Sequence, residues 1–253
     1  MSKNFELLQK LGREQELLGS IDGNRRELSG ATIPAIAAAS PGAVTQPGLE
    51  EVHALAQQIF LTSGADTPRM VAFASTEAGS GCSWVCTHLG EVLASRVAGS
   101  VCLVDANLRD PGLHQNFGCD NDNGISDALV RLDPIRTFAR PLSTPNLWLI
   151  SAGSRGEEAQ ALLSSDRMRL RLTELRKEFD YVLIDTAAMS ICNDGIGIGC
   201  MCDGVVMVLK ANASRRETAR QAIQDLQSGK AKVLGAVLNQ RTFPIPDSIY
   251  KKL

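Results

Sequence analysis

The sequence predicts an α/β fold, in which a doubly wound and mostly parallel sheet is flanked by helices. The first observation behind this prediction is that, from Arg69 onward, nearly continuous runs rich in Val, Ile and Leu alternate with stretches of helical periodicity. Such runs are typical of strands that a parallel sheet buries on both faces. The second observation is that a glycine-rich loop and two aspartates each follow an apolar run directly. In α/β sheets, ligands bind where the carboxyl ends of the strands meet.

The elements follow from these runs in chain order. We expect strands at Met70–Ala74, Val101–Asp105, Leu147–Ser151, Tyr181–Asp185, Gly204–Leu209 and Val233–Asn239. The segments between them have apolar residues at the spacing of amphipathic helices. We expect helices at Ser83–Ala98, Ile125–Leu132, Asp166–Glu178 and Arg215–Gln227. Right-handed crossovers would place these helices on both faces of the sheet.

The chain is expected to divide into a helix, a linker, a folded domain and a tail. Residues 1–19 have leucines among charged residues and are predicted to form an amphipathic helix, which either packs on its own domain or docks to a partner. Residues 20–48 are rich in Gly, Pro, Ala and Ser and are predicted to be a flexible linker. The folded domain is expected at 49–240, followed by a tail at 241–253.

Length and composition indicate one soluble domain and argue against some partners. A chain of 253 residues can bury a sizeable core. The 26 Lys and Arg against 28 Asp and Glu give a net charge of -2, which argues against nucleic acid as a partner. No apolar run approaches the ~18 residues of a membrane span, so we expect a cytoplasmic protein without a transmembrane segment. The seven cysteines are expected to be free thiols, with Cys192, Cys200 and Cys202 as the one group to consider for a metal.

The loop after the first strand has the pattern of a phosphate-binding loop, or P-loop. In such loops backbone N–H groups cradle phosphate, a Ser or Thr hydroxyl binds Mg²⁺, and a Lys neutralises the β- and γ-phosphates. Gly79, Ser80, Gly81 and Ser83 retain the first two functions, whereas Cys82 occupies the lysine position. A thiol is mostly neutral at pH 7. The sequence therefore predicts a loop that can hold a nucleotide but is poorly equipped to react it, with nucleotide contacts at Gly79, Ser80, Gly81, Cys82, Ser83 and Trp84.

Two aspartates are predicted to complete this site. Asp105 and Asp185 each end an apolar strand, which is the form of a Walker B element that organises Mg²⁺. Magnesium prefers carboxylate and hydroxyl oxygens together with retained waters. A single Asp after a strand is more often a helix cap or turn residue, but two of them with a P-loop favour a site. We expect Asp105 and Asp185 to be the catalytic carboxylates of an impaired site. With Ser83, they would hold Mg²⁺ together with bound ATP or ADP.

Longer strings resemble the bacterial tyrosine kinase family, the cytoplasmic ATPase modules of capsule and exopolysaccharide co-polymerases. These strings are VDANLRDPGLH at 104–114, NGISD at 123–127, LLSS at 162–165 and FDYVLIDT at 179–186. The resemblance covers roughly residues 49 to 240 and implies a P-loop NTPase fold related to the MinD/ParA-like deviant Walker ATPases. It also implies that Asp185 is the Walker B acid, that Asp105 belongs to a second Walker motif, and that Asn239 contacts adenine.

The departures from the family concern its catalytic features. Cys82 replaces the family's lysine, Glu77 adds a negative charge to the loop, and Asn107 stands where a second acid is usual. Ala187-Ala188 replaces the Pro-Pro that is common after the Walker B Thr. The family's tyrosine cluster, where autophosphorylation occurs, is reduced to Tyr250.

The assembly motif departs as well. The family forms rings through a Glu-x-x-Arg-x-x-Arg helix, and the segment from Glu50 to Ala56 resembles it with His53 and Ala56 in place of the arginines. Two side chains without a guanidinium cannot reproduce two arginine contacts. We therefore expect a monomer or a weak dimer.

Three functions are compatible with these observations. The preferred one is a degenerate, pseudokinase-like adaptor or regulator in exopolysaccharide or capsule biosynthesis, whose partner is a membrane polysaccharide co-polymerase (a chain-length determinant protein) or an active kinase paralogue. That partner would recruit it to the inner face of the membrane. The second is an active tyrosine autokinase that uses a cation from elsewhere, with Arg109 as the nearest candidate. The third is a MinD/ParA-type positioning ATPase, which the tail disfavours because it lacks a long basic amphipathic helix.

Overall fold

A computed structural model describes residues 35–36, 46–62, 67–153 and 157–240 of the chain. The predicted amphipathic helix at 1–19 and the predicted tail at 241–253, with Tyr250, lie outside the described residues, as does most of the predicted linker at 20–48. Two residues of that linker, Ala35–Ile36, form a short strand, and the first described helix begins at Gln46, three residues before the predicted start of the domain.

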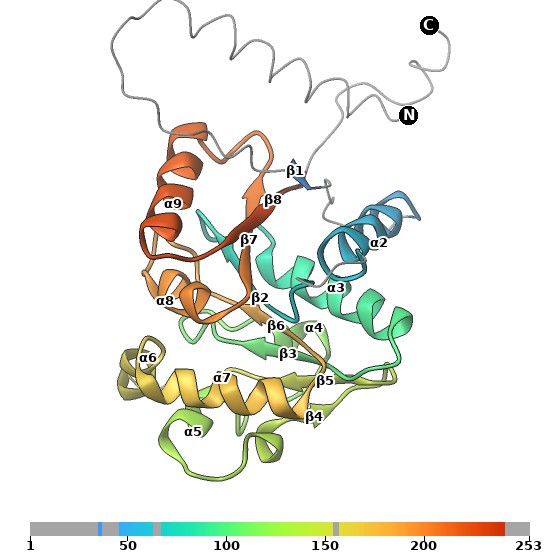
Figure 1. Cartoon of the computed structure of the whole chain (residues 1–253), viewed down its shortest axis with the longest axis vertical. Coiled ribbons are helices and arrows are strands. Elements are labelled where there is room, and N and C mark those ends of the chain that lie inside the picture. Colours follow the sequence, from blue (N-terminus) through green and yellow to red (C-terminus); the bar gives the residue numbers. More distant parts are fainter. Residues whose placement is uncertain (1–34, 37–45, 63–66, 154–156, 241–253) are drawn as a thin grey trace, which may run out of the picture.

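The described residues form one mixed sheet of eight strands at the centre of the molecule (Figure 1). The strands lie in the order β1-β8-β7-β2-β6-β3-β5-β4, and every neighbouring pair is parallel except β4 with β5. Their bounds are β1 Ala35–Ile36, β2 Met70–Ser75, β3 Val101–Asp105, β4 Arg140–Pro141, β5 Leu147–Ile150, β6 Tyr181–Asp185, β7 Gly204–Lys210 and β8 Val233–Asn239. The doubly wound, mostly parallel sheet predicted from the sequence is confirmed.

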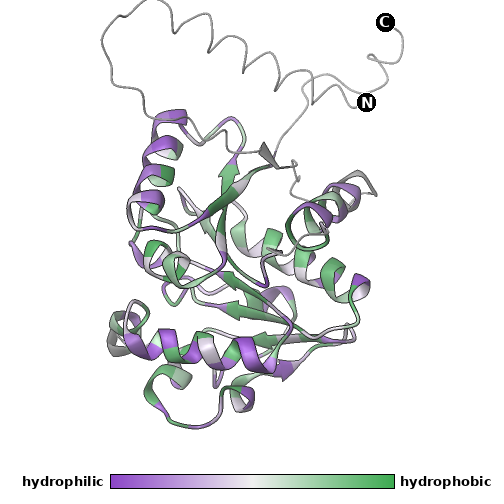
Figure 2. Ribbon diagram, in the orientation of Figure 1, coloured by the Kyte–Doolittle hydropathy of each residue, from purple (hydrophilic) through white to green (hydrophobic). Residues whose placement is uncertain are grey.

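Helices cover both faces of this sheet (Figure 1). One face packs against α2 (Gln46–Phe60), α3 (Cys82–Arg96) and α4 (Leu113–Asn116). The opposite face packs against α5 (Ile125–Val130), a 3-10 helix (Ile135–Phe138), α6 (Glu157–Leu162), α7 (Asp166–Glu178), α8 (Asp194–Met201) and α9 (Arg216–Ser228). The central strands are apolar along their length, whereas α7 and α9 alternate apolar and polar faces (Figure 2).

The core explains why the predicted strands are apolar without alternation. On β2, Met70 and Ala72 face one layer of helices and Val71 and Phe73 face the other, and none of these side chains is exposed. Successive side chains of a strand point to opposite faces, so a sheet covered on both sides needs apolar residues at every position. The same holds for β3, which is buried throughout.

The helix predicted at Ile125–Leu132 ends earlier, at Val130. Two arginines of α7 account for this, because they bind carbonyl groups of its last turn. Arg171 donates from Nε to the Ala128 carbonyl (2.7 Å), and Arg167 donates from Nη1 to the Leu129 carbonyl (2.8 Å). Side-chain donors replace the helical partners that these carbonyls would otherwise need, and the chain leaves the helix.

The burial of residues along helix α2 shifts the expected assembly motif by one position. Ala56 is completely buried against α3, and His53 is half-buried with its Nδ1 3.1 Å from Nη2 of Arg96 in the same chain. The exposed positions at the same spacing are Ala54 and Gln57. An assembly face on this helix would therefore use the register of Ala54 and Gln57, in which arginines are also missing.

Candidate functional site

The glycine-rich loop lies between β2 and α3, as predicted. Gly79 and Gly81 have φ angles of 73° and 81°, in the left-handed region that favours glycine. The Ser80 hydroxyl donates to the Glu77 carbonyl at 2.7 Å, which closes the loop on itself. Helix α3 begins at Cys82, so its free N–H groups and the positive end of its dipole face the loop. This is the arrangement of a binding site for phosphate.

Two side chains at the end of β8 hold this loop. Asn239 donates from Nδ2 to the Ser80 carbonyl (2.9 Å), and Gln240 donates from Nε2 to the Gly79 carbonyl (3.0 Å). The Gln240 backbone N–H in turn donates to Oδ1 of Asn239 (2.9 Å). In this structure Asn239 is buried and serves the loop, and its contact with adenine stays a prediction. Sequence reasoning missed Gln240, although a polar residue directly after a strand is the same signal that drew attention to the aspartates.

The two predicted carboxylates are direct neighbours. Asp105 at the end of β3 pairs in register with Asp185 at the end of β6, and both are fully buried. Asp105 accepts hydrogen bonds from the backbone N–H groups of Asn107 (3.2 Å), Gly112 (3.0 Å) and Leu113 (3.0 Å). Burial, and then the charge of Asp185, raise the pKa of Asp105 to about 8 despite these bonds.

Asp185 has less support. Neither of its carboxylate oxygens accepts a well-formed hydrogen bond from the described residues. Burial raises its pKa to about 6; the Ser83 hydroxyl and the Cys82 thiol are close enough to oppose this rise without satisfying the carboxylate. A buried carboxylate without partners is costly unless it is protonated or binds a cation.

The oxygen atoms of these side chains fit the predicted Mg²⁺. The unsatisfied oxygens of Asp185, the Asp105 carboxylate and the Ser83 hydroxyl supply the oxygen ligands that Mg²⁺ prefers, with waters completing its shell. Within the described ranges, no group of three or more His, Cys, Asp or Glu side chains could hold a metal, and this includes Cys192, Cys200 and Cys202. A metal of the zinc type, which needs a closed set of side-chain ligands, is therefore not supported there.

Cys82 places a neutral group at the lysine position of the loop. Its thiol is buried beside Cys86 and Asp185. The hydrogen bond with Cys86, burial and the negative charge of Asp185 all raise the pKa of Cys82 well above its usual value. The thiol is therefore protonated at neutral pH and contributes no positive charge to the loop.

A cavity of about 250 Å³ opens beside the loop. The predicted residues Gly79–Ser83 line it, together with the segment from Asn107 to Gln115 and the segment from Thr186 to Ile191. No Lys, Arg or His is among the described residues that line it, and Asp110 adds a carboxylate.

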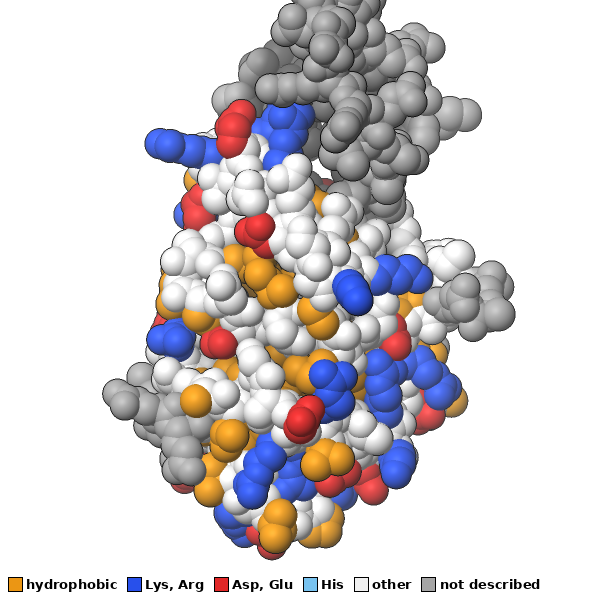
Figure 3. All heavy atoms as spheres, turned by 60° about the vertical axis from the view of Figure 1, so that its left-hand side comes forward, with side chains coloured by type: hydrophobic (Ala, Val, Ile, Leu, Met, Phe, Trp, Pro, Cys, Tyr) orange, Lys and Arg blue, Asp and Glu red, His pale blue; other side chains and the backbone are white. Residues whose placement is uncertain are grey.

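The remaining predicted residues, including the carboxylates of Asp105 and Asp185 and the amide of Asn239, lie outside this lining. Trp84 packs edge-on against His88, with ring centroids 4.3 Å apart. Arg109 is exposed and lies near the Cys192 thiol; burial raises the pKa of this thiol, and Arg109 opposes the rise. Arginines are concentrated instead on α7, and Lys and Arg side chains gather on the lower part of the face in Figure 3.

The curated proteins to which the chain is similar in sequence include bacterial tyrosine-protein kinases. The chain is 27% identical over 200 residues to tyrosine-protein kinase YwqD of Bacillus subtilis, which covers 78% of this chain and 84% of the relative. It is 28% identical over 193 residues to the putative tyrosine-protein kinase EpsB of Ralstonia nicotianae. That match covers 76% of this chain but only 26% of EpsB, so the chain spans about a quarter of the longer relatives. No protein-family model matches the chain.

Solved structures agree on the fold. The kinase domain of the Escherichia coli tyrosine kinase ETK has a TM-score of 0.74 at 20% identity, covering 85% of this chain and 94% of that domain. The BceF tyrosine kinase domain has a TM-score of 0.68 at 26% identity, covering 77% and 79%. The septum site-determining protein MinD of Pyrococcus horikoshii, solved with Mg-ADP, has a TM-score of 0.59 at 19% identity, covering 73% and 76%.

Proposed function

The chain resembles bacterial tyrosine kinases in sequence and fold, and on this premise we propose that it is a degenerate, kinase-like P-loop protein that binds nucleotide weakly and turns over little or none. We infer that it acts as a cytoplasmic adaptor or regulator in exopolysaccharide or capsule biosynthesis and export. The observation that carries the proposal is the protonated Cys82 thiol in a cavity whose described lining contains no cation.

Magnitudes support binding without useful turnover. Loss of one charge-assisted hydrogen bond to phosphate costs about 1.5–3 kcal/mol, which is ~10–150-fold in affinity. Loss of a preorganised donor to the transition state costs a further ~10²–10³ in rate. The backbone N–H groups of Gly79–Ser83 and the start of α3 would still bind phosphate, which supports weak binding of ATP or ADP.

Mg²⁺ would be held by Ser83, Asp105 and Asp185, and it would neutralise phosphate charge when bound. The chain's own residues hold the loop and the start of α4 in place around the cavity. Asp105 holds the amides of Gly112 and Leu113, and so fixes the start of α4 beside the cavity. Asn239 and Gln240 fix the loop on its other side. This framework supports a binding role that survives the loss of the lysine.

Partners are proposed on the resemblance. A membrane polysaccharide co-polymerase or an active kinase paralogue would recruit the chain, with the predicted helix at 1–19 and the tail at 241–253 as docking elements. Among the described residues, no helix is both long and apolar enough to cross a membrane.

A second candidate is an active autokinase, which the intact acidic pair of Asp105 and Asp185 favours. It needs a cation from outside the cavity lining, either Arg109 after a movement of its loop or a residue of a neighbouring subunit. The acidic pair alone does not distinguish the two functions, because an adaptor that binds Mg²⁺-nucleotide would use the same carboxylates.

Calorimetry of Mg²⁺·ATP binding to the full chain, together with an ATP turnover assay, separates these functions. We expect weak binding, further weakened in Asp185→Asn, and turnover no greater than that of Asp185→Asn. Arg220→Gln on α9 is the matched control, because it removes an exposed charge that is not part of the cavity lining. Turnover in the unmodified chain that is lost in Asp185→Asn would overturn the adaptor proposal and favour the autokinase.

A further inference from the structure

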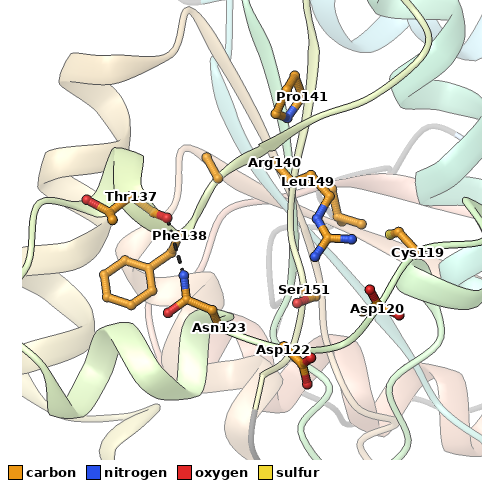
Figure 4. Close-up of a pocket in the computed structure, with 11 residues that line it drawn as sticks. Cys119, Asp120, Asp122, Asn123, Thr137, Phe138, Arg140, Pro141, Leu149 and Ser151 are labelled. Atoms are coloured by element: carbon orange, nitrogen blue, oxygen red, sulfur yellow. Dashed lines mark hydrogen bonds between the residues drawn. The ribbon is translucent and has the colours of Figure 1, made fainter.

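A second cavity lies at the β4–β5 edge of the sheet, separate from the candidate nucleotide cavity (Figure 4). Its volume is about 280 Å³, and none of its lining residues also lines the nucleotide cavity. The lining comes from the loop that follows α4, from the segment between the 3-10 helix and β4, and from the carboxyl end of β5.

The floor of this cavity is set by strand geometry. Leu149 and Ser151 are two residues apart along β5 and its end, so their side chains point to the same face of the sheet. Arg140 of β4 pairs directly with Leu149, and cross-strand partners also share a face. The guanidinium of Arg140, the apolar side chain of Leu149 and the hydroxyl of Ser151 therefore meet at one hollow (Figure 4).

Ser151 presents a hydroxyl without a hydrogen-bond partner to this hollow. The residue is 6% exposed, and its hydroxyl makes no hydrogen bond with the described part of the chain. Its backbone carbonyl is already satisfied by the Ile125 N–H at 2.8 Å. This hydroxyl is therefore available to a ligand in the cavity that Ser151 lines.

Charges of both signs face the same hollow without pairing. Asp120, Asp122 and Arg140 all line it, and none forms an ion pair with another described residue. Asn123 is occupied, because it donates to the Thr137 carbonyl at 3.3 Å. The unpaired groups of this lining thus include two carboxylates, one guanidinium and the hydroxyls of Thr137 and Ser151.

We propose that this cavity binds a small zwitterion of the α-amino acid class. Its carboxylate would accept from Arg140 and from the Ser151 hydroxyl, and its ammonium would donate to Asp120 and Asp122. The cavity is slightly smaller than the ~300 Å³ at which pockets for drug-sized ligands begin, which suits a metabolite of this size. Leu149 supplies an apolar surface for a short side chain.

The lining disfavours a neutral sugar or polyol. Such a ligand would leave the charges of Asp120, Asp122 and Arg140 uncompensated. Sugars also pack on exposed aromatic faces, and the one aromatic residue of this lining, Phe138, is 3% exposed with its ring directed away from the hollow (Figure 4).

Saturation-transfer NMR of the full chain with an equimolar mixture of common α-amino acids tests the proposal. The same experiment with propylamine, propionate and glycerol supplies compounds that carry one function each. We expect at least one amino acid to bind with a Kd in the low millimolar range or tighter, and each single-function compound to bind at least about tenfold more weakly. Chemical shifts of the ¹⁵N-labelled chain should move at residues 119–123 and 149–151.

Three variants assign the binding to this hollow. We expect each variant to weaken binding; they are Arg140→Gln, Ser151→Ala and the double variant Asp120→Asn with Asp122→Asn. The loss for Arg140→Gln should be about tenfold, because a charge-assisted contact is removed. Arg220→Gln on α9 is the matched control and should bind as the unmodified chain does. The altered charged side chains are exposed, so circular dichroism should report intact folds.

Two results would overturn the proposal. One is that no amino acid binds below about 10 mM, or that glycerol binds as tightly as the best amino acid. The other is that Arg140→Gln and Ser151→Ala leave the Kd unchanged while both remain folded. Because the nucleotide cavity shares no lining residue with this one, Asp185→Asn should leave amino acid binding intact whether or not ATP binds.

Discussion

Asp105 and Asp185 lie side by side at the carboxyl ends of β3 and β6, and neither carboxylate is exposed to solvent. Asp105 is held by three backbone N–H groups, whereas Asp185 accepts no well-formed hydrogen bond from the described residues. Ionising both of two neighbouring buried acids is unfavourable without a cation. The pair therefore couples the stability of the fold to protons and, in the proposed function, to Mg²⁺.

The first prediction concerns pH. The pKa of Asp105 is raised to about 8 and that of Asp185 to about 6, so the folded protein holds more protons than the unfolded chain between about pH 4 and pH 8. Stability must then fall as the pH rises through this window. Asp180 and Asp203 have lowered pKa values, and their contribution changes only below about pH 4. Urea unfolding of the full chain at pH 5 and pH 8, without divalent ions, measures the difference.

Asp185→Asn is the control for this prediction. It removes one of the two negative charges and supplies an amide that can donate to Asp105, so its stability should depend less on pH. At pH 8 we expect it to be more stable than the unmodified chain by about 1–3 kcal/mol, the usual cost of an unsatisfied buried polar group. If the two proteins lose stability in parallel between pH 5 and pH 8, the acidic pair is not the cause.

The second prediction compares two glycines of the loop. Both have positive φ angles, so alanine at either costs about 1–2 kcal/mol in backbone strain. A Cβ on Gly79 would have no neighbour within 4 Å, whereas a Cβ on Gly81 would lie 2.1 Å from Nδ2 of Asn239. Gly81→Ala should therefore destabilise by about 3 kcal/mol or more, because a clash adds to the strain. Equal losses in denaturant unfolding would mean that Asn239 does not brace the loop.

The sequence predicted the fold and the meeting of its polar strand ends, because both follow from local patterns. A run such as VCLVD at 101–105 indicates a buried strand, and parallel strands bring their carboxyl ends to one edge. It did not predict which polar groups are satisfied. That Asp105 has three donors while Asp185 lacks a well-formed one depends on how the 106–113 segment folds back, and this is a tertiary property.

Other contacts of the site could not be predicted from the sequence either, because they also depend on tertiary packing. The Cys82 thiol could be placed at the lysine position from the motif, but its contact with Asp185 requires the packing of α3 on β6. Gln240 holds the loop across a sequence separation of 161 residues, which no periodicity reports. The assembly register was wrong by one residue, because only the structure shows that Ala56 faces the core while Gln57 faces solvent.

The third prediction restores the missing charge. Cys82→Lys should tighten Mg²⁺·ATP binding by ~10–150-fold, since a charge-assisted hydrogen bond to phosphate is worth about 1.5–3 kcal/mol. Cys82→Met is the matched control, because it lengthens the side chain without adding a charge. Calorimetry on both variants and on the unmodified chain measures the effect. Equal affinities for the Lys and Met variants would show that the neutral thiol is not what limits binding.

The fourth prediction concerns assembly. The exposed positions of α2 at the spacing of the assembly motif are Ala54 and Gln57, and the nearby His53 is in contact with Arg96 of its own chain. None of these offers a free guanidinium, so the arginine contacts of a family-type ring cannot form. We expect a monomer or a weak dimer by light scattering at neutral pH. A stable closed ring would contradict this. Two double variants test the corrected register. Ala54→Arg with Gln57→Arg should form larger assemblies. His53→Arg with Ala56→Arg should lose its fold, because an arginine at 56 would enter the core between α2 and α3.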